Sequence, residues 1–125
     1  MLLLDAGALL ALERDDRLTW RRLEMCVRDG VRAVTHAGVI GQVWRGGQGR
    51  QARLAVALRG VEIVSLDDGL GRRAGVLLGR AGAADIVDAA LVALAGDDDR
   101  ILTSDAADIQ ALVDVFGRHV DVVPV

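Results

Sequence analysis

Short apolar segments alternate with segments of helical periodicity along the chain, and no other feature of the sequence limits the possible folds so strongly. The expected strands are residues 2–4, 31–35, 61–65, 100–104 and 119–125. The expected helices are residues 6–13, 16–28, 36–45, 50–59, 66–82, 84–95 and 106–115. Short apolar strands that are separated by helices predict a parallel sheet with helices on both faces. The fold class is therefore α/β, and we expect residues 1–125 to form one domain.

Composition excludes several classes of protein. Apolar residues make up 52% of the chain and charged residues 26%, which indicates a folded, soluble protein. No apolar run approaches the roughly 18 residues that span a bilayer, and the opening MLLLDAG is too short for a signal peptide. The single cysteine, Cys26, excludes a disulfide framework and is expected in the core. We therefore expect a cytoplasmic protein without membrane association.

Four aspartates occupy positions that the predicted sheet would bring together. Asp5 directly follows the strand 2–4, and Asp105 directly follows the strand 100–104. Because the carboxyl ends of parallel strands lie at one edge of the sheet, both side chains should project from that edge. Asp85 and Asp88 lie three residues apart at the start of a helix, and that helix leads into the second of these strands. We expect its N-terminus to face the same edge.

Most of these aspartates also have a local explanation. Asp85 and Asp105 stand where a helix N-cap is expected, and Asp5 stands where a turn residue is expected. Asp88 is harder to explain locally because it lies inside an apolar helix. The acidic run 97–99 follows the end of that helix, where the helix dipole disfavours anions, and we interpret it as a solvated loop.

Converging carboxylates predict a metal site. Two of them about 4 Å apart repel by roughly 4 kcal/mol at an effective dielectric constant of about 20, and several would raise each other's pKa values unless a cation joined them. Oxygen ligands without His or Cys favour Mg²⁺ or Mn²⁺. Such an ion activates water and neutralises charge on a phosphoryl group. The aspartates therefore predict a metal-dependent phosphodiesterase.

Three other sites are excluded by the sequence. A phosphoacceptor receiver domain needs a lysine, and all fifteen basic residues are arginine. A haloacid-dehalogenase-type phosphatase needs an aspartate where this chain has Gly7. The glycine pattern at 47–52 follows a helix rather than a strand, so it would form no dinucleotide cradle. His36 and His119 pair with no nucleophile, and we expect them to be structural or exposed.

Three segments occur in order over nearly the whole chain: LLLDAGALLALE, DIVDAALVALA and ILTSDAADIQAL. Together they resemble the PIN domain, and more narrowly the small bacterial toxins of the VapC type. The resemblance implies a parallel, usually five-stranded sheet with helices on both sides. It also implies a cytosolic Mg²⁺-dependent endoribonuclease that is held inactive by a small antitoxin. The implied catalytic and metal-binding positions are Asp5, Asp88 and Asp105, with Asp85 or Asp108 as helpers.

The sequence departs from the family pattern at one position. The helix after the second strand usually carries a Glu, and Gln42 takes its place here. An amide oxygen can accept a hydrogen bond or bind a metal, but it brings no charge and cannot act as a base. Two functions therefore stay open. One is an active ribonuclease toxin in which Asp85 replaces the missing charge, and the other is a catalytically weak PIN-like domain that mainly binds a protein or RNA.

RNA contacts are predicted near the glycine-rich stretch 46–49, which ends the helix 36–45. Arg45, Arg50 and Arg53 flank this stretch and are candidates for gripping phosphates. A solvated helix face is the alternative for Arg50 and Arg53. The net charge of −3 gives no general attraction to nucleic acid, so any RNA site must be a local basic strip.

A protein partner is predicted from the acidic site itself. An Arg of a small cognate antitoxin can pair with the aspartates and displace the metal or block the substrate. We expect either a homodimer or a toxin–antitoxin hetero-oligomer. The candidate apolar docking residues are Leu23, Val27, Val39 and Trp44, and core packing is the expected role for most of them.

Overall fold

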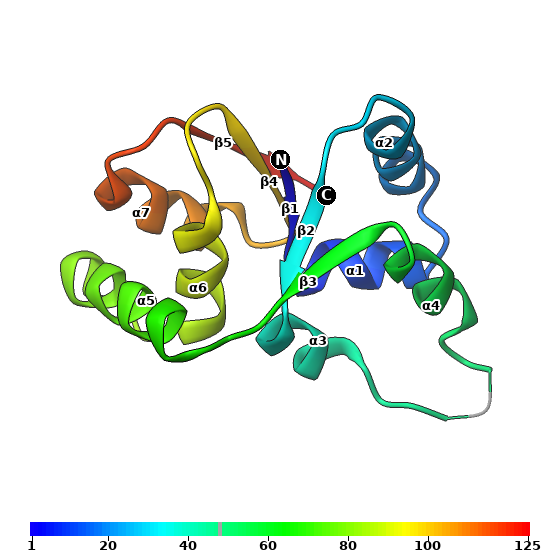
Figure 1. Cartoon of the computed structure of the whole chain (residues 1–125), viewed down its shortest axis with the longest axis horizontal. Helices are drawn as coiled ribbons and strands as arrows, with labels where there is room; N and C mark the ends of the chain where they lie inside the picture. The colour runs from blue at the N-terminus through cyan, green and yellow to red at the C-terminus, as the bar shows by residue number, and fades with distance from the viewer. Residues whose placement is uncertain (48) are drawn as a thin grey trace.

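The computed structural model describes residues 1–47 and 49–125, which form a five-stranded parallel sheet with helices on both faces (Figure 1). The strands are β1 (Leu2–Leu4), β2 (Ala33–His36), β3 (Val61–Val64), β4 (Asp99–Thr103) and β5 (Val120–Pro124). The helices are α1 (Ala6–Glu13), α2 (Arg17–Arg28), α3 (Ala37–Val43), α4 (Ala52–Leu58), α5 (Asp68–Ala81), α6 (Ile86–Leu94) and α7 (Ala106–Phe116). The predicted α/β class is confirmed. The predicted break at 46–49 includes Gln48, which lies outside the described residues.

Every predicted strand and helix is present, and the ends differ from the prediction by at most two residues. Several of these shifts have one cause. Asp16, Asp67 and Asp85 fall within the predicted helix ranges, but they have extended backbone angles and act as N-caps, which for Asp85 is the local role expected from the sequence. Each carboxylate accepts a hydrogen bond from a backbone N–H two or three residues further on. The helices therefore begin one residue after these aspartates.

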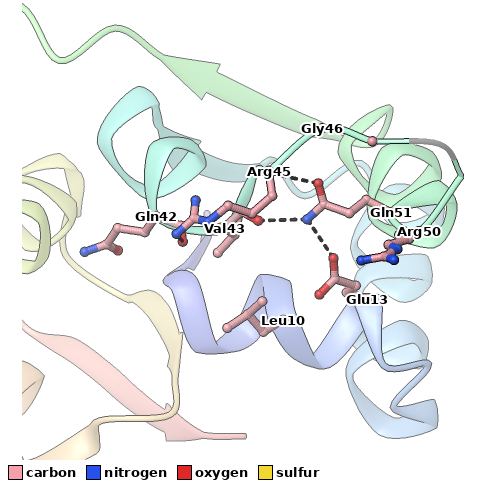
Figure 2. Close-up of a pocket in the computed structure, with 9 residues that line it drawn as sticks. Leu10, Glu13, Gln42, Val43, Arg45, Gly46, Arg50 and Gln51 are labelled. Carbon is pink, nitrogen blue, oxygen red and sulfur yellow. Dashed lines mark hydrogen bonds between the residues drawn. The ribbon is translucent and has the colours of Figure 1, made fainter.

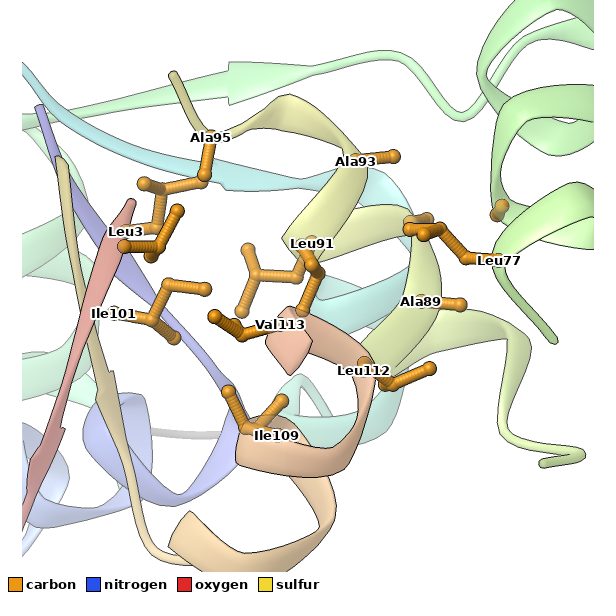
Figure 3. Packing of buried hydrophobic residues seen from close by; sticks show 14 of the residues in the cluster. Leu3, Leu77, Ala89, Leu91, Ala93, Ala95, Ile101, Ile109, Leu112 and Val113 are labelled. Atoms are coloured by element: carbon orange, nitrogen blue, oxygen red, sulfur yellow. The ribbon is translucent and has the colours of Figure 1, made fainter. Parts of the chain in front are cut away.

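The central strands carry apolar side chains on both faces because helices cover both faces. Leu3 and Ile101 point to the layer of α5, α6 and α7, where they pack with residues such as Leu91, Ile109 and Val113 (Figure 3). The neighbours of Leu3 in β1 point to the opposite layer, which is formed by α1, α2, α3 and α4. Both layers bury fully enclosed leucines, so the two faces of the sheet form two cores.

The strand order is β3-β2-β1-β4-β5, and every pair of neighbours is parallel. From β1 the chain proceeds in one direction to β2 and β3, and it then returns to the other side of β1 for β4 and β5. The direction of winding therefore reverses between β1 and β4. In open α/β sheets ligands bind beyond the carboxyl ends of the strands at this reversal. The residues that follow β1 and β4 are Asp5 and Ser104.

The acidic run 97–99 is the predicted solvated loop only in part, because Asp97 and Asp98 are exposed turn residues but Asp99 is not. Asp99 is the first residue of β4, and its carboxylate binds the amino group of Met1 at 2.5 Å and the N–H of Gly96 at 2.7 Å. Asp97 accepts a hydrogen bond from the backbone of His119. The contacts with Met1 and His119 join segments that are distant in the sequence, so local charge does not predict them.

Within residues 1–47 and 49–125, none of the helices combines the length and the hydrophobicity that crossing a bilayer requires.

Candidate active site

Asp5 is a buried carboxylate at the junction of β1 and α1, with only 5% of its surface exposed. One oxygen, Oδ1, accepts a hydrogen bond from the N–H of Ala8 at 2.8 Å and so caps α1. The other oxygen, Oδ2, accepts a short hydrogen bond from the hydroxyl of Thr103, the last residue of the neighbouring strand β4. Two adjacent strands therefore hold this carboxylate in one orientation.

Thr103 also positions Asp105. Its hydroxyl oxygen accepts a hydrogen bond from the N–H of Asp105 at 2.8 Å, so one side chain contacts both aspartates that follow strands. Asp105 occupies the N-cap position of α7, but its carboxylate makes no capping hydrogen bond. A side-chain hydrogen bond with Asp108, partial desolvation and the charges of Asp108, Asp5 and Asp85 raise the pKa of Asp105. Asp105 therefore does not act as the predicted N-cap through its side chain.

The start of α6 brings the second pair of aspartates to the same edge. Asp85 caps the helix through hydrogen bonds from the N–H groups of Val87 and Asp88, at 3.0 and 3.1 Å. Asp88 lies in the first turn and is half-buried. Burial, followed by the negative charges of Asp85, Asp5 and two further aspartates, raises its pKa from 3.8 to about 6. These charges act on one another, so all of the aspartates lie in one region.

We call this region the acid cluster, and its members are Asp5, Asp85, Asp88, Asp105 and Asp108. Its donor set consists of carboxylate oxygens only, which suits a hard divalent cation such as Mg²⁺ or Mn²⁺. Neighbouring carboxylates raise each other's pKa when no cation neutralises them, and the pKa of Asp88 is raised in this way. Among the described residues, no three His, Cys, Asp or Glu side chains already stand at metal-ligand positions. The donor chemistry and the charge of the cluster fit a cation, but its side chains do not stand in a metal-ligand arrangement.

A close approach of two loops shapes the edge beside Asp5. A Cβ on Gly7, in the first turn of α1, would fall 1.8 Å from the hydroxyl of Ser104 and 2.2 Å from its Cβ. Only glycine therefore allows the segment after β4 to lie against α1. The sequence did not predict this contact, because Gly7 and Ser104 are far apart along the chain.

Gly7→Ala is expected to destabilise the protein by about 1–3 kcal/mol, since the new methyl group overlaps Ser104. Urea unfolding checks the value. Gly71→Ala is the matched control: it lies in α5, a Cβ there meets nothing, and the substitution should stabilise the helix by about 0.5–1 kcal/mol. Adding Ser104→Gly to Gly7→Ala should restore part of the loss. Equal stability of the two alanine variants would show that α1 and the segment after β4 can move apart without cost.

His36 is a polar residue whose contacts the sequence did not reveal. It is the last residue of β2 and is fully buried. Its ring lies 2.8 Å from the carbonyl oxygen of Val87 in α6, and 3.1 Å from the N–H of Gly38 in α3. Burial lowers the pKa of the imidazole, so the ring is neutral at pH 7. The expectation of a structural histidine is correct, whereas His119 is exposed and pairs with Asp98.

A hollow of about 900 Å³ lies between α1 and the segment after α3 (Figure 2). Its lining residues are Leu10, Glu13, Gln42, Val43, Arg45, Gly46, Gly47, Arg50 and Gln51. Gln42 is exposed, and Figure 2 shows its side chain turned away from Glu13 and Gln51. Two of the predicted RNA-contacting residues, Arg45 and Arg50, line the hollow. The third does not, because Arg53 lies near Asp15 at 3.9 Å.

Gln51 shapes this hollow, and sequence reasoning missed it. Its amide nitrogen donates to Glu13 at 2.7 Å and to the carbonyl of Val43 at 2.8 Å, while its amide oxygen accepts from the N–H of Arg45 at 2.9 Å (Figure 2). The guanidinium of Arg45 is also occupied, since it donates to the carbonyl oxygens of Gly41, Gln42 and Trp44. Arg45 therefore completes the C-terminal end of α3.

The predicted docking residues divide into core and surface. Leu23 and Val39 are buried, so they have the core-packing role that was expected for most of the four residues. Val27 and Trp44 are exposed by 58% and 42%. Val27 belongs to an apolar groove of about 300 Å³ between α2 and α4. The groove is lined by Trp20, Leu23, Glu24, Val27, Arg28, Val56, Ala57 and Gly60.

The fold and the edge aspartates define a parallel α/β domain with an acidic site at the reversal between β1 and β4. No protein-family model matches the sequence, and no curated protein matches it. The structure is similar to a chain in the crystal structure of VapBC2 from Rickettsia felis bound to a DNA fragment from their promoter, with a TM-score of 0.71. The similarity covers 97% of each chain at 12% sequence identity. The predicted PIN-like fold is therefore confirmed.

Proposed function

We propose that this chain is a divalent-metal-dependent endoribonuclease and acts as the toxin of a toxin–antitoxin pair. The observation that carries the proposal is the acid cluster at the strand reversal, where Asp88 has a pKa raised to about 6. Gathering like charges opposes folding, and strongly perturbed carboxylates of this kind cluster at functional sites. The fold shared with a chain of VapBC2, a VapB–VapC complex, supports this assignment.

Asp5, Asp88 and Asp105 would hold Mg²⁺ or Mn²⁺, and Asp85 and Asp108 would add negative charge around it. When bound, such an ion activates water and neutralises charge on the scissile phosphate. The chain's own contribution is orientation: the two hydrogen bonds to Asp5 leave one lone pair on each of its oxygens. This carboxylate can therefore bind a cation without giving up the bonds that hold it.

The test is cleavage of labelled single-stranded RNA by the purified chain in Mg²⁺, in Mn²⁺ and in EDTA. Cleavage that requires either ion and disappears in Asp105→Asn is the expected result. Asp114→Asn is the matched control, because this exposed aspartate of α7 bonds to Gln110 and lies outside the acid cluster. Cleavage that persists in EDTA would contradict the proposal.

A second candidate function follows from Gln42, which is exposed and neutral. A PIN-like domain with one carboxylate fewer can bind RNA or a partner without efficient cleavage. We expect Gln42→Glu to tighten Mn²⁺ binding by about 1–3 kcal/mol, because it adds a charge to the site. Calorimetric titration measures the change, and Gln110→Glu, at an exposed position of α7 outside the acid cluster, is the control. Unchanged or weaker affinity would mean that Gln42 does not face the ion, and that the missing charge at this position does not weaken metal binding.

For the RNA strand we propose contacts with Arg50 and Arg53. Both are exposed, whereas the guanidinium of Arg45 is held by backbone carbonyls. Arg50 lines the hollow beside Gln42, and an arginine there can pair with phosphate in two parallel hydrogen bonds. Arg45 then serves to shape the hollow.

For the partner we propose a small antitoxin that places an arginine in the acid cluster and apolar residues in the groove of α2 and α4. We expect co-expression from the native operon to yield one complex by size-exclusion chromatography. Replacing the antitoxin arginine by alanine should preserve the complex but release nuclease activity, since the groove contacts remain. Val56→Asp should weaken the complex, because it places a charge in the groove. A chain that always elutes alone would contradict this proposal.

A further inference from the structure

We propose that His36 is a positioning residue, which holds the first turn of α6, and with it Asp88, against the carboxyl end of β2. The role of Asp88 as a metal ligand rests on the proposed function. The contact by which His36 holds the turn that carries Asp88 does not depend on that function. This positioning role goes beyond the acid cluster because His36 is not one of the carboxylates and ends β2, whereas Asp5 and Asp105 come after β1 and β4.

The two hydrogen bonds of the ring define its protonation. Because the N–H of Gly38 donates to Nδ1, the ring proton of neutral His36 lies on Nε2, which donates to the carbonyl of Val87. One tautomer therefore satisfies both contacts at once. The first bond starts α3, since His36 is its N-cap, and the second bond reaches α6. The ring thus joins two helices that carry positions of the site, Gln42 and Asp88.

The first turn of α6 needs such an attachment. Residues 83–85, which precede it, are all exposed, so the connection from α5 supplies little packing. The charges of Asp85, Asp5 and Asp105 repel an ionised Asp88 and favour movement of this turn away from the sheet. Val87 is the neighbour of Asp88 in that turn. A partly buried hydrogen bond from His36 to its carbonyl opposes this repulsion in the same turn.

Gly38 supports this reading independently. A Cβ at this position would lie 2.8 Å from Cε1 of His36 and 3.1 Å from Nδ1. The ring therefore occupies the space that only a glycine leaves open at the start of α3. Gly41 lies in the same helix, yet a Cβ there meets nothing within 4 Å. The two glycines make a matched pair for testing the position of the ring.

The test uses the full chain and two substitutions that separate the hydrogen bonds. The asparagine of His36→Asn can still accept the hydrogen bond from the N–H of Gly38, but its side chain is too short to reach Val87. The glutamine of His36→Gln can extend toward the carbonyl of Val87, but it no longer provides the acceptor for Gly38. In the metal-free protein, we expect the amides of the first turn of α6 to exchange hydrogen about tenfold faster in His36→Asn. In His36→Gln they should stay within about twofold of the wild type, and His119→Asn should change nothing.

Mn²⁺ binding gives a second measurement. His36→Asn should weaken it about three- to tenfold, while His36→Gln and His119→Asn retain it, because displacement of Asp88 lowers affinity without removing a ligand. If His36→Asn does not fold, Gly38→Ala carries the test: it should speed exchange in α6, although alanine favours a helix, whereas Gly41→Ala should not.

Unchanged exchange in α6 and unchanged Mn²⁺ affinity in both His36→Asn and Gly38→Ala would overturn the proposal, whatever happens to thermal stability. A wild-type chain that binds no Mn²⁺ and cleaves no RNA would instead refute the proposed function. The exchange measurement would still decide whether His36 holds α6, so the two failures are distinguishable.

Discussion

Asp88→Asn is expected to abolish RNA cleavage, by about a hundredfold or more, and at the same time to make the metal-free protein more stable at neutral pH. The loss of cleavage follows from removal of a proposed metal ligand. The gain in stability follows from the environment of Asp88, whose ionised form is disfavoured by burial and by neighbouring aspartates. Among the described residues no hydrogen bond holds its carboxylate, so asparagine loses no partner.

The gain in stability has a defined pH dependence. The folded protein holds the Asp88 proton up to about pH 6, whereas an ordinary aspartate releases it near 3.8. Between these values the folded state binds more protons than the unfolded state, so stability falls as the pH rises. The shift sets an upper limit of about 3 kcal/mol, which solvent screening reduces to about 1–2 kcal/mol. Below about pH 4 wild type and variant should be equally stable.

Thermal unfolding in EDTA at pH 4, 6 and 8 checks this prediction. At pH 8 the variant should melt roughly 3–10 °C above the wild type. Added Mg²⁺ should raise the melting temperature of the wild type more than that of the variant, because binding to the folded state stabilises it. A variant that is less stable than the wild type at pH 8 would contradict the environment described for Asp88.

Asp5→Asn is expected to abolish cleavage as well, but to lower stability by about 1–3 kcal/mol. The asparagine oxygen can still cap α1 at Ala8. Its amide nitrogen, however, would face the hydroxyl of Thr103, which already accepts a hydrogen bond from Asp105 and needs an acceptor for its own proton. A buried hydroxyl would then lose its acceptor. The same chemical change thus has opposite effects on stability at Asp5 and Asp88.

Asp67→Asn provides the matched control for Asp5→Asn. Asp67 also caps a helix, through the N–H of Leu70, but it is exposed and lies outside the acid cluster. Because asparagine and aspartate are comparable N-caps, this control should change stability by less than about 0.5 kcal/mol. Urea unfolding of the three variants measures the difference. If Asp5→Asn were as stable as the wild type, the bond from Thr103 would contribute little.

The gathering of the aspartates in the acid cluster could be predicted because Asp5, Asp88 and Asp105 are each marked locally. Asp5 and Asp105 each follow an apolar strand closely, and Asp88 is a charge inside an apolar helix. Parallel strands place such residues at one edge whatever the order of the strands. The residues that position them carry no comparable mark. Thr103 is one of several β-branched strand residues, and His36 is distinguished only as a polar residue that ends an apolar strand.

The sequence by itself determined the elements of this protein and the edge at which its aspartates gather, because side-chain periodicity and strand direction are local properties. Only the tertiary structure decided that β1 lies beside β4, that the ring of His36 reaches α6, and that Asp99 binds the N-terminus. It also decided that Leu23 is buried while Val27 is exposed. These outcomes depend on which distant segments pack together. Periodicity shows that a face is buried, but it does not show what covers that face.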